Sequence, residues 1–255
     1  MTIRDVEVAR RAAQAAADVL LALRAGGEFA GRALGDAGDA AAQRAIVASL
    51  AADRPDDLIF SEEAADDPRR LSAERVWIVD PLDGTREYGE VPRHDWAVHV
   101  ALWEGGDLTA AAVALPGLGE ILLTEPAPQL PPRADGAVRV AVSRSRPPAE
   151  ATAVAELLDA ELVPLGSAGY KTVAVARGEV DAYVHSGGQY QWDSAAPVAI
   201  ARAAGLTTCR LDGSPLIYNA PDPWLPDLVV CRPELADRIL DAIRPRSPEK
   251  TESIA

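Results

Sequence analysis

The sequence predicts an α+β arrangement in its first half and an α/β arrangement in its second, with helices covering the sheets. In the first half, short apolar stretches follow one another across tight turns between residues 96 and 124, as in an antiparallel meander. In the second half, strand-like and helix-like stretches alternate, which is typical of an α/β layer. The 255 residues, 48% of them apolar, suffice for one large domain or two small ones.

Two helices are expected to open the chain. Apolar residues at helical spacing predict the first over residues 3–24, ending before Gly26 and Gly27, and the second is expected to start near Asp39. A short helix is expected after Gly84. The strands predicted in this half are 58–60, 76–79, 96–103, 108–115 and 121–124. Asp80 lies at the carboxyl end of the second of them.

A proline-rich polar stretch, 125–136, is the predicted internal boundary. It divides an N-terminal part, 1–135, from a C-terminal part, 136–244, and a disordered tail is expected over 245–255. In the second part we expect a turn at 186–188. The elements predicted there are strands 138–142, 161–165 and 181–184, and helices 148–159, 168–177, 193–204 and 233–243.

The charge balance excludes some classes of partner. With 25 Lys and Arg against 39 Asp and Glu, the formal net charge is −14, which argues against binding to nucleic acid or to anionic membranes. The N-terminus lacks the apolar core of a signal peptide, and no apolar run approaches membrane length. Cys209 and Cys231 are expected to be buried and reduced, as in a cytoplasmic protein. Small phosphorylated ligands remain compatible, because bound metal ions can supply a local positive field.

The most informative motif is DPLDGT at residues 80–85, at the end of a predicted buried strand. A proline bend after Asp80 can point that carboxylate, the Leu82 carbonyl and Asp83 toward one centre, and these are ligands for a hard cation. The backbone amides at Gly84, where a helix begins, suit a phosphate. A simple Asp-Pro/Asp-Gly turn that caps a helix is an equally good reading of the motif taken alone.

Two further acidic motifs accompany it in the sequence. SEE at 61–63 follows a strand, and WDSAAP at 192–197 opens an apolar helix. Taken singly, Glu62 and Glu63 fit a solvated loop and Asp193 fits a helix N-cap. In this order, the three motifs resemble those of the inositol monophosphatase superfamily, whose members are magnesium-dependent, lithium-sensitive phosphatases.

The resemblance extends over roughly residues 3–243 and implies a layered α-β-α-β-α sandwich of the inositol monophosphatase and fructose-1,6-bisphosphatase type. It implies two or three Mg²⁺ ions and direct attack of water on the phosphate, with Asp39 and Thr85 orienting and activating that water. The family usually carries Thr-x-Ala-Asp before the second helix, whereas this chain has GDAGD at 35–39. The implied metal ligands are Glu62, Asp80, the Leu82 carbonyl, Asp83 and Asp193.

Two loops in the second half resemble those of the CysQ-type 3'(2'),5'-bisphosphate nucleotidases: SRSR at 143–146 and GSAGYK at 166–171. That branch removes the 3'-phosphate of adenosine 3',5'-bisphosphate and its sulfated relative, which implies a link to sulfur assimilation. Arg144, Arg146 and Lys171 could grip the second phosphate, although a solvated loop and a surface helix residue are the simpler readings. The residues expected to contact substrate are Glu62, Asp83, Gly84, Thr85, Arg86, Ser143, Arg144, Ser167, Lys171 and Asp193.

Two alternatives remain open. The first keeps the chemistry but changes the substrate to inositol 1-phosphate or fructose 1,6-bisphosphate. The second is a non-catalytic sensor that binds metal and nucleotide, and the presence of both Asp39 and Thr85 favours an enzyme over it. The resemblance also implies a homodimer. His99 is expected to be structural, and the role of His185 is left open.

Overall fold

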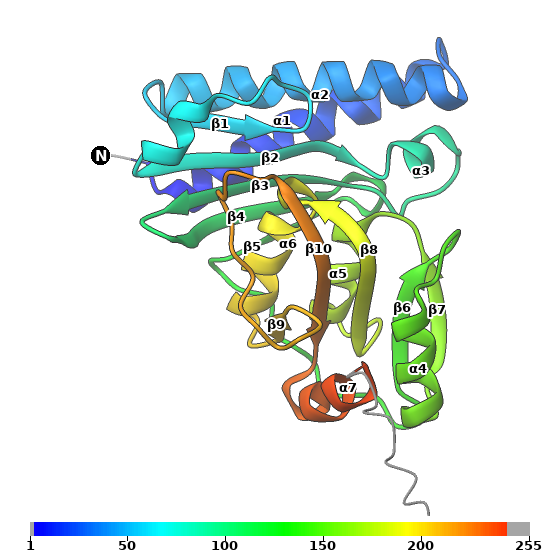
Figure 1. The fold of residues 1–255 in the computed structure, drawn as a ribbon. Coiled ribbons are helices and arrows are strands. Elements are labelled where there is room, and N and C mark those ends of the chain that lie inside the picture. Colours follow the sequence, from blue (N-terminus) through cyan, green and yellow to red (C-terminus); the bar gives the residue numbers. More distant parts are fainter. Residues whose placement is uncertain (1–2, 244–255) are drawn as a thin grey trace, which may run out of the picture.

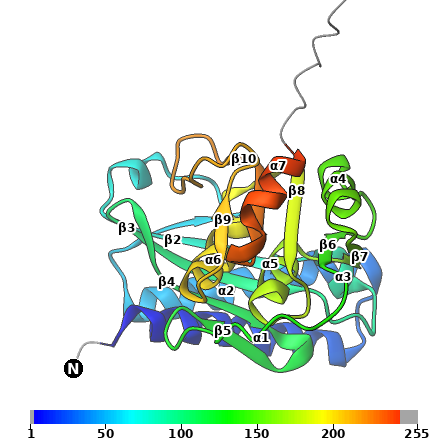
Figure 2. The same cartoon turned by 90° about the horizontal axis from the view of Figure 1, so that it is seen from below.

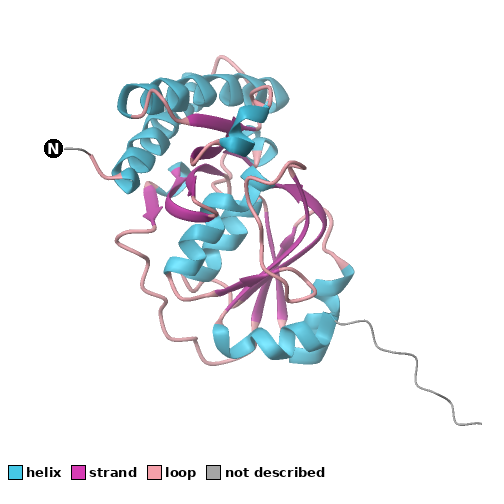
Figure 3. Cartoon of the chain, turned by 60° about the vertical axis from the view of Figure 1, so that its left-hand side comes forward, coloured by secondary structure: helices cyan, strands magenta, loops and turns pink. Residues whose placement is uncertain are grey.

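The computed structural model describes residues 3–243, which fold into five layers (Figure 1). Two long helices cover the outer face of the first sheet, and a second pair lies between the two sheets. A third pair covers the far face of the second sheet. Figure 3 shows the helices between the two sets of strands. The predicted α-β-α-β-α sandwich is therefore confirmed.

The first sheet has the order β1-β2-β3-β4-β5, with β1 parallel to β2 and every other pair antiparallel. The predicted meander is thus present. Helices α1 and α2 pack against β2–β4 on the outer face. The elements of this half are α1 Asp5–Gly26, α2 Gly31–Asp53, β1 Leu58–Ser61, η1 Pro68–Ser72, β2 Arg75–Asp83, α3 Thr85–Gly89, β3 Ala97–Glu104, β4 Asp107–Leu115, η2 Pro116–Leu118 and β5 Glu120–Leu123.

The second sheet has the order β7-β6-β8-β10-β9, with β6 parallel to both β7 and β8. Strand β10 runs antiparallel to both of its neighbours (Figure 2). The elements of this half are β6 Arg139–Ser143, α4 Ala149–Leu158, β7 Glu161–Leu165, α5 Ala168–Ala176, β8 Ala182–Tyr190, α6 Gln191–Ala203, β9 Thr207–Cys209, β10 Trp224–Cys231, η3 Pro233–Leu235 and α7 Ala236–Ile243.

Helix α2 begins at Gly31, so the prediction of a start near Asp39 is wrong. The glycines of this stretch lie inside the helix because α3 packs directly against it. A Cβ on Gly35 would come within 2.5 Å of Thr85 Cγ2, and one on Gly38 within 2.7 Å of Tyr88 Cε1. These glycines serve close packing between helices, whereas glycine in a sequence usually signals a helix end.

Strand β8 is longer than predicted, and the turn expected at 186–188 is part of it. Gly187 and Gly188 have φ values of 94° and 88°, and the pairing with β10 shifts register opposite them. A Cβ on Gly188 would lie 1.6 Å from the Trp224 ring, so only glycine lets this ring lie against the strand. The local pattern of glycines resembles a turn because a bulge requires the same residues.

The helices between the sheets come from the second half of the chain but pack against both sheets. Helix α6 is buried along most of its length, because it faces β2–β4 on one side and the second sheet on the other. One apolar core therefore contains residues of both halves. The predicted boundary at 125–136 falls between the strands of the first sheet and those of the second. The division into two domains stays a prediction. The tail predicted at 245–255 lies outside the described residues. Within residues 3–243, no helix has the length and apolar character needed to cross a membrane.

Candidate active site

The end of β2 places two carboxylates in the interior, on the side of the first sheet that faces α6. Asp80 is 1% exposed, and one of its oxygens accepts a hydrogen bond from the Leu82 amide at 3.0 Å. The other, Oδ2, has no hydrogen-bond partner among residues 3–243. The pairing of β2 with β3 is irregular between Asp80 and Asp83, which turns both side chains to one centre. Burial, reinforced by the charges of Asp83 and Glu62, raises the pKa of Asp80 well above its usual range.

Asp83 is held by the turn that begins α5. The Ser167 hydroxyl donates to Asp83 Oδ2 at 2.5 Å, the Gly169 amide donates to the same atom at 2.5 Å, and the Ala168 amide donates to Oδ1 at 3.3 Å. The first half of the chain thus supplies the carboxylate and the second half orients it. This places the predicted residues Asp83 and Ser167 in direct contact.

His99, expected from the sequence to be structural, lies beside both aspartates, a position that the sequence did not predict. It lies opposite Asp80 in the register of β2 and β3 and is fully buried. Its Nδ1 is 3.2 Å from the Trp192 carbonyl, and its Nε2 is 3.5 Å from Asp83 Oδ2. Burial lowers the pKa of His99, so its imidazole is neutral, and Nδ1 carries the proton because a carbonyl can only accept. The register of two antiparallel strands is the signal that would have found it.

Glu62 and Asp193 reach the same centre from distant parts of the chain. Glu62 follows β1, and partial burial together with the charges of Asp83 and Glu63 raises its pKa to about 7. Asp193 is in the first turn of α6, where its Oδ2 accepts from the Tyr190 amide at 2.6 Å. Burial, followed by the charge of Asp83, raises the pKa of Asp193 to about 8. The N-cap itself is Tyr190, so Asp193 is not the cap that its sequence position suggests.

Asp39 and Thr85 face one another between α2 and α3. The Thr85 hydroxyl is 3.5 Å from Asp39 Oδ1 and 3.2 Å from the Leu82 carbonyl. Burial, with the charges of Glu63 and Glu62, raises the pKa of Asp39 to about 7. The pair that the sequence analysis selected for orienting water therefore lies together, beside the carbonyl predicted as a metal ligand.

This donor set fits a divalent cation. Donor atoms of Asp80, Asp83 and His99 lie within 4.8 Å of one another, and the carboxylates raise each other's pKa values. Asp80 Oδ2 and His99 Nε2 are buried without a hydrogen-bond partner. Buried acceptors of this kind are costly unless a cation or a proton satisfies them. Oxygen-rich sets suit hard divalent cations such as Mg²⁺ or Ca²⁺.

Comparison with known proteins agrees with this geometry. The model of the inositol monophosphatase family matches residues 2–246. This chain belongs to the inositol monophosphatase family. A 3'-phosphoadenosine 5'-phosphate phosphatase of Mycobacterium leprae is 48% identical over 95% of this chain and 94% of its own, and the Mycobacterium tuberculosis protein of that name is 50% identical over 82% of each. The 3'(2'),5'-bisphosphate nucleotidase CysQ of Escherichia coli is 30% identical over 74% of this chain and 81% of its own.

Solved structures of the family share the fold. CysQ from Bacteroides thetaiotaomicron is 26% identical, with a TM-score of 0.77, over 89% of this chain and 97% of its own. An inositol monophosphatase from Staphylococcus aureus has a TM-score of 0.78 at 20% identity, over 94% of this chain and 95% of its own. The family predicted from the sequence is confirmed, together with its fold.

The buried arginine Arg70 connects two segments of the chain that carry carboxylates of the site, the loop after Glu62 and the turn before Asp193. Arg70, in η1, is fully buried and lies 3.9 Å from the centre of the Phe60 ring. It donates to Asn219 Oδ1 at 2.8 Å and to the Ala220 carbonyl at 3.0 Å. The Gln191 side chain, at the start of α6, donates to Ala220 as well. The loop after Glu62 and the turn before Asp193 are therefore connected through one polar network.

The cations predicted to contact substrate have other partners. Arg144 Nε is 2.6 Å from Glu87 Oε1, and its Nη2 is 2.8 Å from Glu90 Oε2. Lys171 is 4% exposed, and its ammonium donates to the carbonyls of Gly166 and Ser167. Burial lowers the pKa of Lys171 to about 8. The surface-helix reading of Lys171 is wrong, and its contact with a phosphate stays a prediction.

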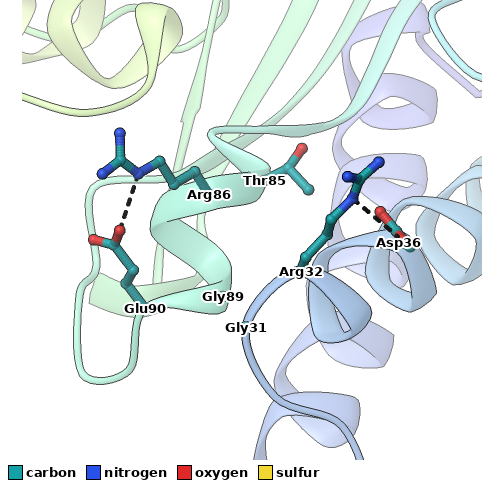
Figure 4. A pocket seen from close by; sticks show the side chains of 7 residues that line it. All are labelled: Gly31, Arg32, Asp36, Thr85, Arg86, Gly89 and Glu90. Atoms are coloured by element: carbon teal, nitrogen blue, oxygen red, sulfur yellow. Dashed lines mark hydrogen bonds and ion pairs between the residues drawn. The ribbon is translucent and has the colours of Figure 1, made fainter. Parts of the chain in front are cut away.

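A cavity of about 330 Å³ opens beside Thr85, between α2 and α3. Figure 4 shows Thr85 between two ion pairs, Arg86 with Glu90 on one side and Arg32 with Asp36 on the other. Gly31 and Gly89 form its base where the two helices touch.

Proposed function

We propose that this chain removes the 3'-phosphate from adenosine 3',5'-bisphosphate, and from its sulfated relative, in a magnesium-dependent reaction linked to sulfur assimilation. The chain is a phosphoric monoester hydrolase of the inositol monophosphatase family. The substrate follows from the names of relatives that are 48% and 50% identical over most of both chains. The observation that carries the chemistry is the crowded group of buried carboxylates around Asp80, whose Oδ2 has no hydrogen-bond partner among the described residues.

The residues that would hold two or three Mg²⁺ ions are Glu62, Asp80, Asp83, Asp193 and the carbonyl of Leu82. When bound, magnesium would supply positive charge that stabilises the charge developing on the phosphate and lowers the pKa of water. Asp83 keeps its orientation through the Ser167 hydroxyl and the Gly169 amide. Asp193 keeps its orientation through the Tyr190 amide.

The attacking water would be positioned by Thr85 and Asp39. The Thr85 hydroxyl has one hydrogen and lies near two acceptors, Asp39 Oδ1 and the Leu82 carbonyl. Its oxygen can therefore accept a hydrogen bond from a water on its open side. With a pKa of about 7, the Asp39 carboxyl can exchange a proton near neutral pH, which suits a general base. Binding of phosphate oxygens by the amides of Gly84 and Thr85 stays a prediction, as does the contribution of Arg86.

The test is phosphate release from four substrates with and without Mg²⁺. We expect the highest kcat/KM on adenosine 3',5'-bisphosphate and its sulfated relative, and much lower values on inositol 1-phosphate and fructose 1,6-bisphosphate. Release should stop in EDTA and return with Mg²⁺. A preference for inositol 1-phosphate would contradict the proposed substrate but not the proposed hydrolysis of a phosphate monoester. Tight nucleotide binding without phosphate release would instead indicate a non-catalytic sensor.

The proposal includes a homodimer that acts in the cytoplasm. Cys209 and Cys231 are both buried and free, which is compatible with a reducing compartment. Light scattering after gel filtration checks the mass of the particle, for which twice 26.8 kDa is expected. A monomer at all concentrations would contradict this part of the proposal without touching the chemistry.

A further inference from the structure

His99, in β3, lies where the end of β2 meets the start of α6. Asp80 is its partner in the register of the two strands. Its Nδ1 donates to the Trp192 carbonyl at 3.2 Å, since a carbonyl can only accept. Trp192 is in the first turn of α6 and directly precedes Asp193. One side chain of the first sheet therefore holds the backbone of the turn that carries a proposed cation ligand.

Close packing fixes the place of this imidazole. The side chain is fully buried, and a Cβ on Gly169, at the start of α5, would lie 1.9 Å from His99 Nε2. Nε2 is 3.5 Å from Asp83 Oδ2 and has no hydrogen-bond partner among residues 3–243. Of the two ring nitrogens, Nδ1 is thus the one that connects segments of the site.

The first turn of α6 needs support from outside the helix. Pro197 lies inside α6, four residues after Asp193. Proline has no N–H, so it cannot give the Asp193 carbonyl its usual helical hydrogen bond, and its ring crowds that carbonyl. Two hydrogen bonds hold this turn from outside: the Gln191 amide donates to the loop before β10 at 2.9 Å, and His99 donates to Trp192. Of these two, the second comes from the sheet that carries the buried aspartates.

We propose that His99 is a positioning residue for Asp193: the hydrogen bond from its Nδ1 keeps the first turn of α6, and with it the Asp193 carboxylate, beside the end of β2. This inference rests on the proposed function, in which Asp193 is a cation ligand. His99 acts through the Trp192 peptide and touches neither substrate nor cation. Loss of such a supporting contact typically weakens metal binding roughly 10–100-fold.

Two amide substitutions separate the roles of the two nitrogens. The side-chain NH₂ of His99→Asn can replace Nδ1 as a donor, whereas that of His99→Gln reaches the place of Nε2. The probe is Mn²⁺, and the free ion is measured by electron paramagnetic resonance without substrate. We expect His99→Asn to bind Mn²⁺ within about threefold of the wild type, and His99→Gln to bind it roughly tenfold more weakly. His94→Gln is the matched control, because His94 is exposed in the loop before β3.

A background without the Asp193 carboxylate tests whether His99 acts through it. In Asp193→Asn, the further substitution His99→Gln should change Mn²⁺ affinity by less than about threefold, because both changes remove the same contribution. Urea unfolding of every variant identifies conditions in which all are folded, and Mn²⁺ binding is compared there.

Four results would each overturn the positioning role: wild-type Mn²⁺ affinity in His99→Gln, equal losses in the asparagine and glutamine variants, recovery by glutamine alone, or losses that add in the double variant. Recovery by glutamine alone would assign Nε2 to the cation instead. Phosphate release is a separate measurement. A wild type that shows the expected Mn²⁺ binding but hydrolyses none of the four substrates would overturn the proposed function, and not the support of Asp193 by His99.

Discussion

Strand β2 carries a group of charged side chains at each end, and the two groups differ in their counter-charges. At its start, Arg75 lies 2.9 Å from Asp5, 3.2 Å from Asp57 and 2.6 Å from Glu104. Although partial burial raises the pKa of Asp5, hydrogen bonds from Arg75 and Arg54 hold it below its usual value. At its end, Asp80 is surrounded by other carboxylates, and its pKa is raised.

Aspartates therefore have opposite electrostatics at the two ends of one strand: those around Arg75 are ion-paired, and those around Asp80 are crowded together. The starting group is an ion-paired cluster, which is complete without any ligand. The group at Asp80 is incomplete, because one oxygen of that buried carboxylate has no hydrogen-bond partner. Buried carboxylates that are crowded together, with one oxygen lacking a hydrogen-bond partner, indicate a cation-binding site, whereas ion-paired carboxylates indicate a structural role.

The largest expected effect comes from neutralising the incomplete group. We expect Asp80→Asn to lower phosphate release roughly 10³-fold, because a cation that stabilises the transition state loses a ligand. Asp57→Asn, at the other end of β2, is the control: it should keep its activity and lose about 1–3 kcal/mol of unfolding free energy, since Arg75 and the Trp77 indole lose a partner. Near-normal turnover by Asp80→Asn would contradict the inference that the carboxylates around Asp80 bind a cation needed for the reaction, whereas those at the start of β2 serve structure.

The next effect concerns the water-positioning pair. Asp39→Asn should lower kcat roughly 10²-fold with little change in KM, because a neutral amide cannot take up a proton. Asp36, one turn earlier on α2, is exposed and paired with Arg32, so Asp36→Asn should behave as the wild type. Steady-state kinetics with saturating Mg²⁺ measures both variants. Equal effects of the two substitutions would show that charge on α2, and not the contact with Thr85, is what matters.

A third prediction concerns the side chain that holds the carboxylates around Asp80 in place. Arg70→Met should cost about 3 kcal/mol of unfolding free energy and raise the Mg²⁺ concentration needed for half-maximal binding, because Glu62 and Asp193 lose their common support. Urea unfolding and Trp192 fluorescence during Mg²⁺ titration are the measurements. Arg69→Met is the matched control, since Arg69 is paired with Asp67 at the surface. An unchanged Mg²⁺ titration for Arg70→Met would reduce its role to stability.

The smallest effect is the pH dependence of the metal-free protein. Glu62 and Asp193 have folded pKa values of about 7 and 8, above their unfolded values, so the folded state binds more protons between about pH 4 and 8. Stability in EDTA should therefore fall as pH rises from 5.5 to 8, by roughly 5 °C in Tm, and Mg²⁺ should restore it. The lowered pKa of Asp5 acts in the opposite sense, but only as the pH falls below about 4. A Tm that rises with pH in EDTA would contradict the raised values.

Features that depend on a short continuous stretch were predictable from the sequence. The motif at 80–85 predicts two neighbouring aspartates that a bend turns to one centre, and the structure has this arrangement, while their role as metal ligands stays a prediction. The layered architecture was predictable through the family resemblance, and the meander through turn spacing. The position of Thr85 beside Asp39 followed from the same resemblance.

Features that depend on strand register or on burial were not predictable. His99 reaches the site because β3 pairs with β2 in one register, which no local pattern specifies. Lys171 and Arg70 are charged residues that the fold buries, and their sequence neighbours do not reveal it. The helical glycines at 35 and 38 misled the prediction of α2, because their function is to admit a partner from a distant segment.

Those glycines also affect how the site assembles. Each glycine inside a helix lowers its intrinsic stability by about 1 kcal/mol relative to alanine, and α2 has three between residues 31 and 38. The first turns of this helix therefore depend on packing against α3, where a Cβ on Gly89 would lie 2.6 Å from the Gly31 carbonyl oxygen. Since Asp39 follows these turns and Thr85 begins α3, the contact that stabilises the start of α2 also brings the two side chains together.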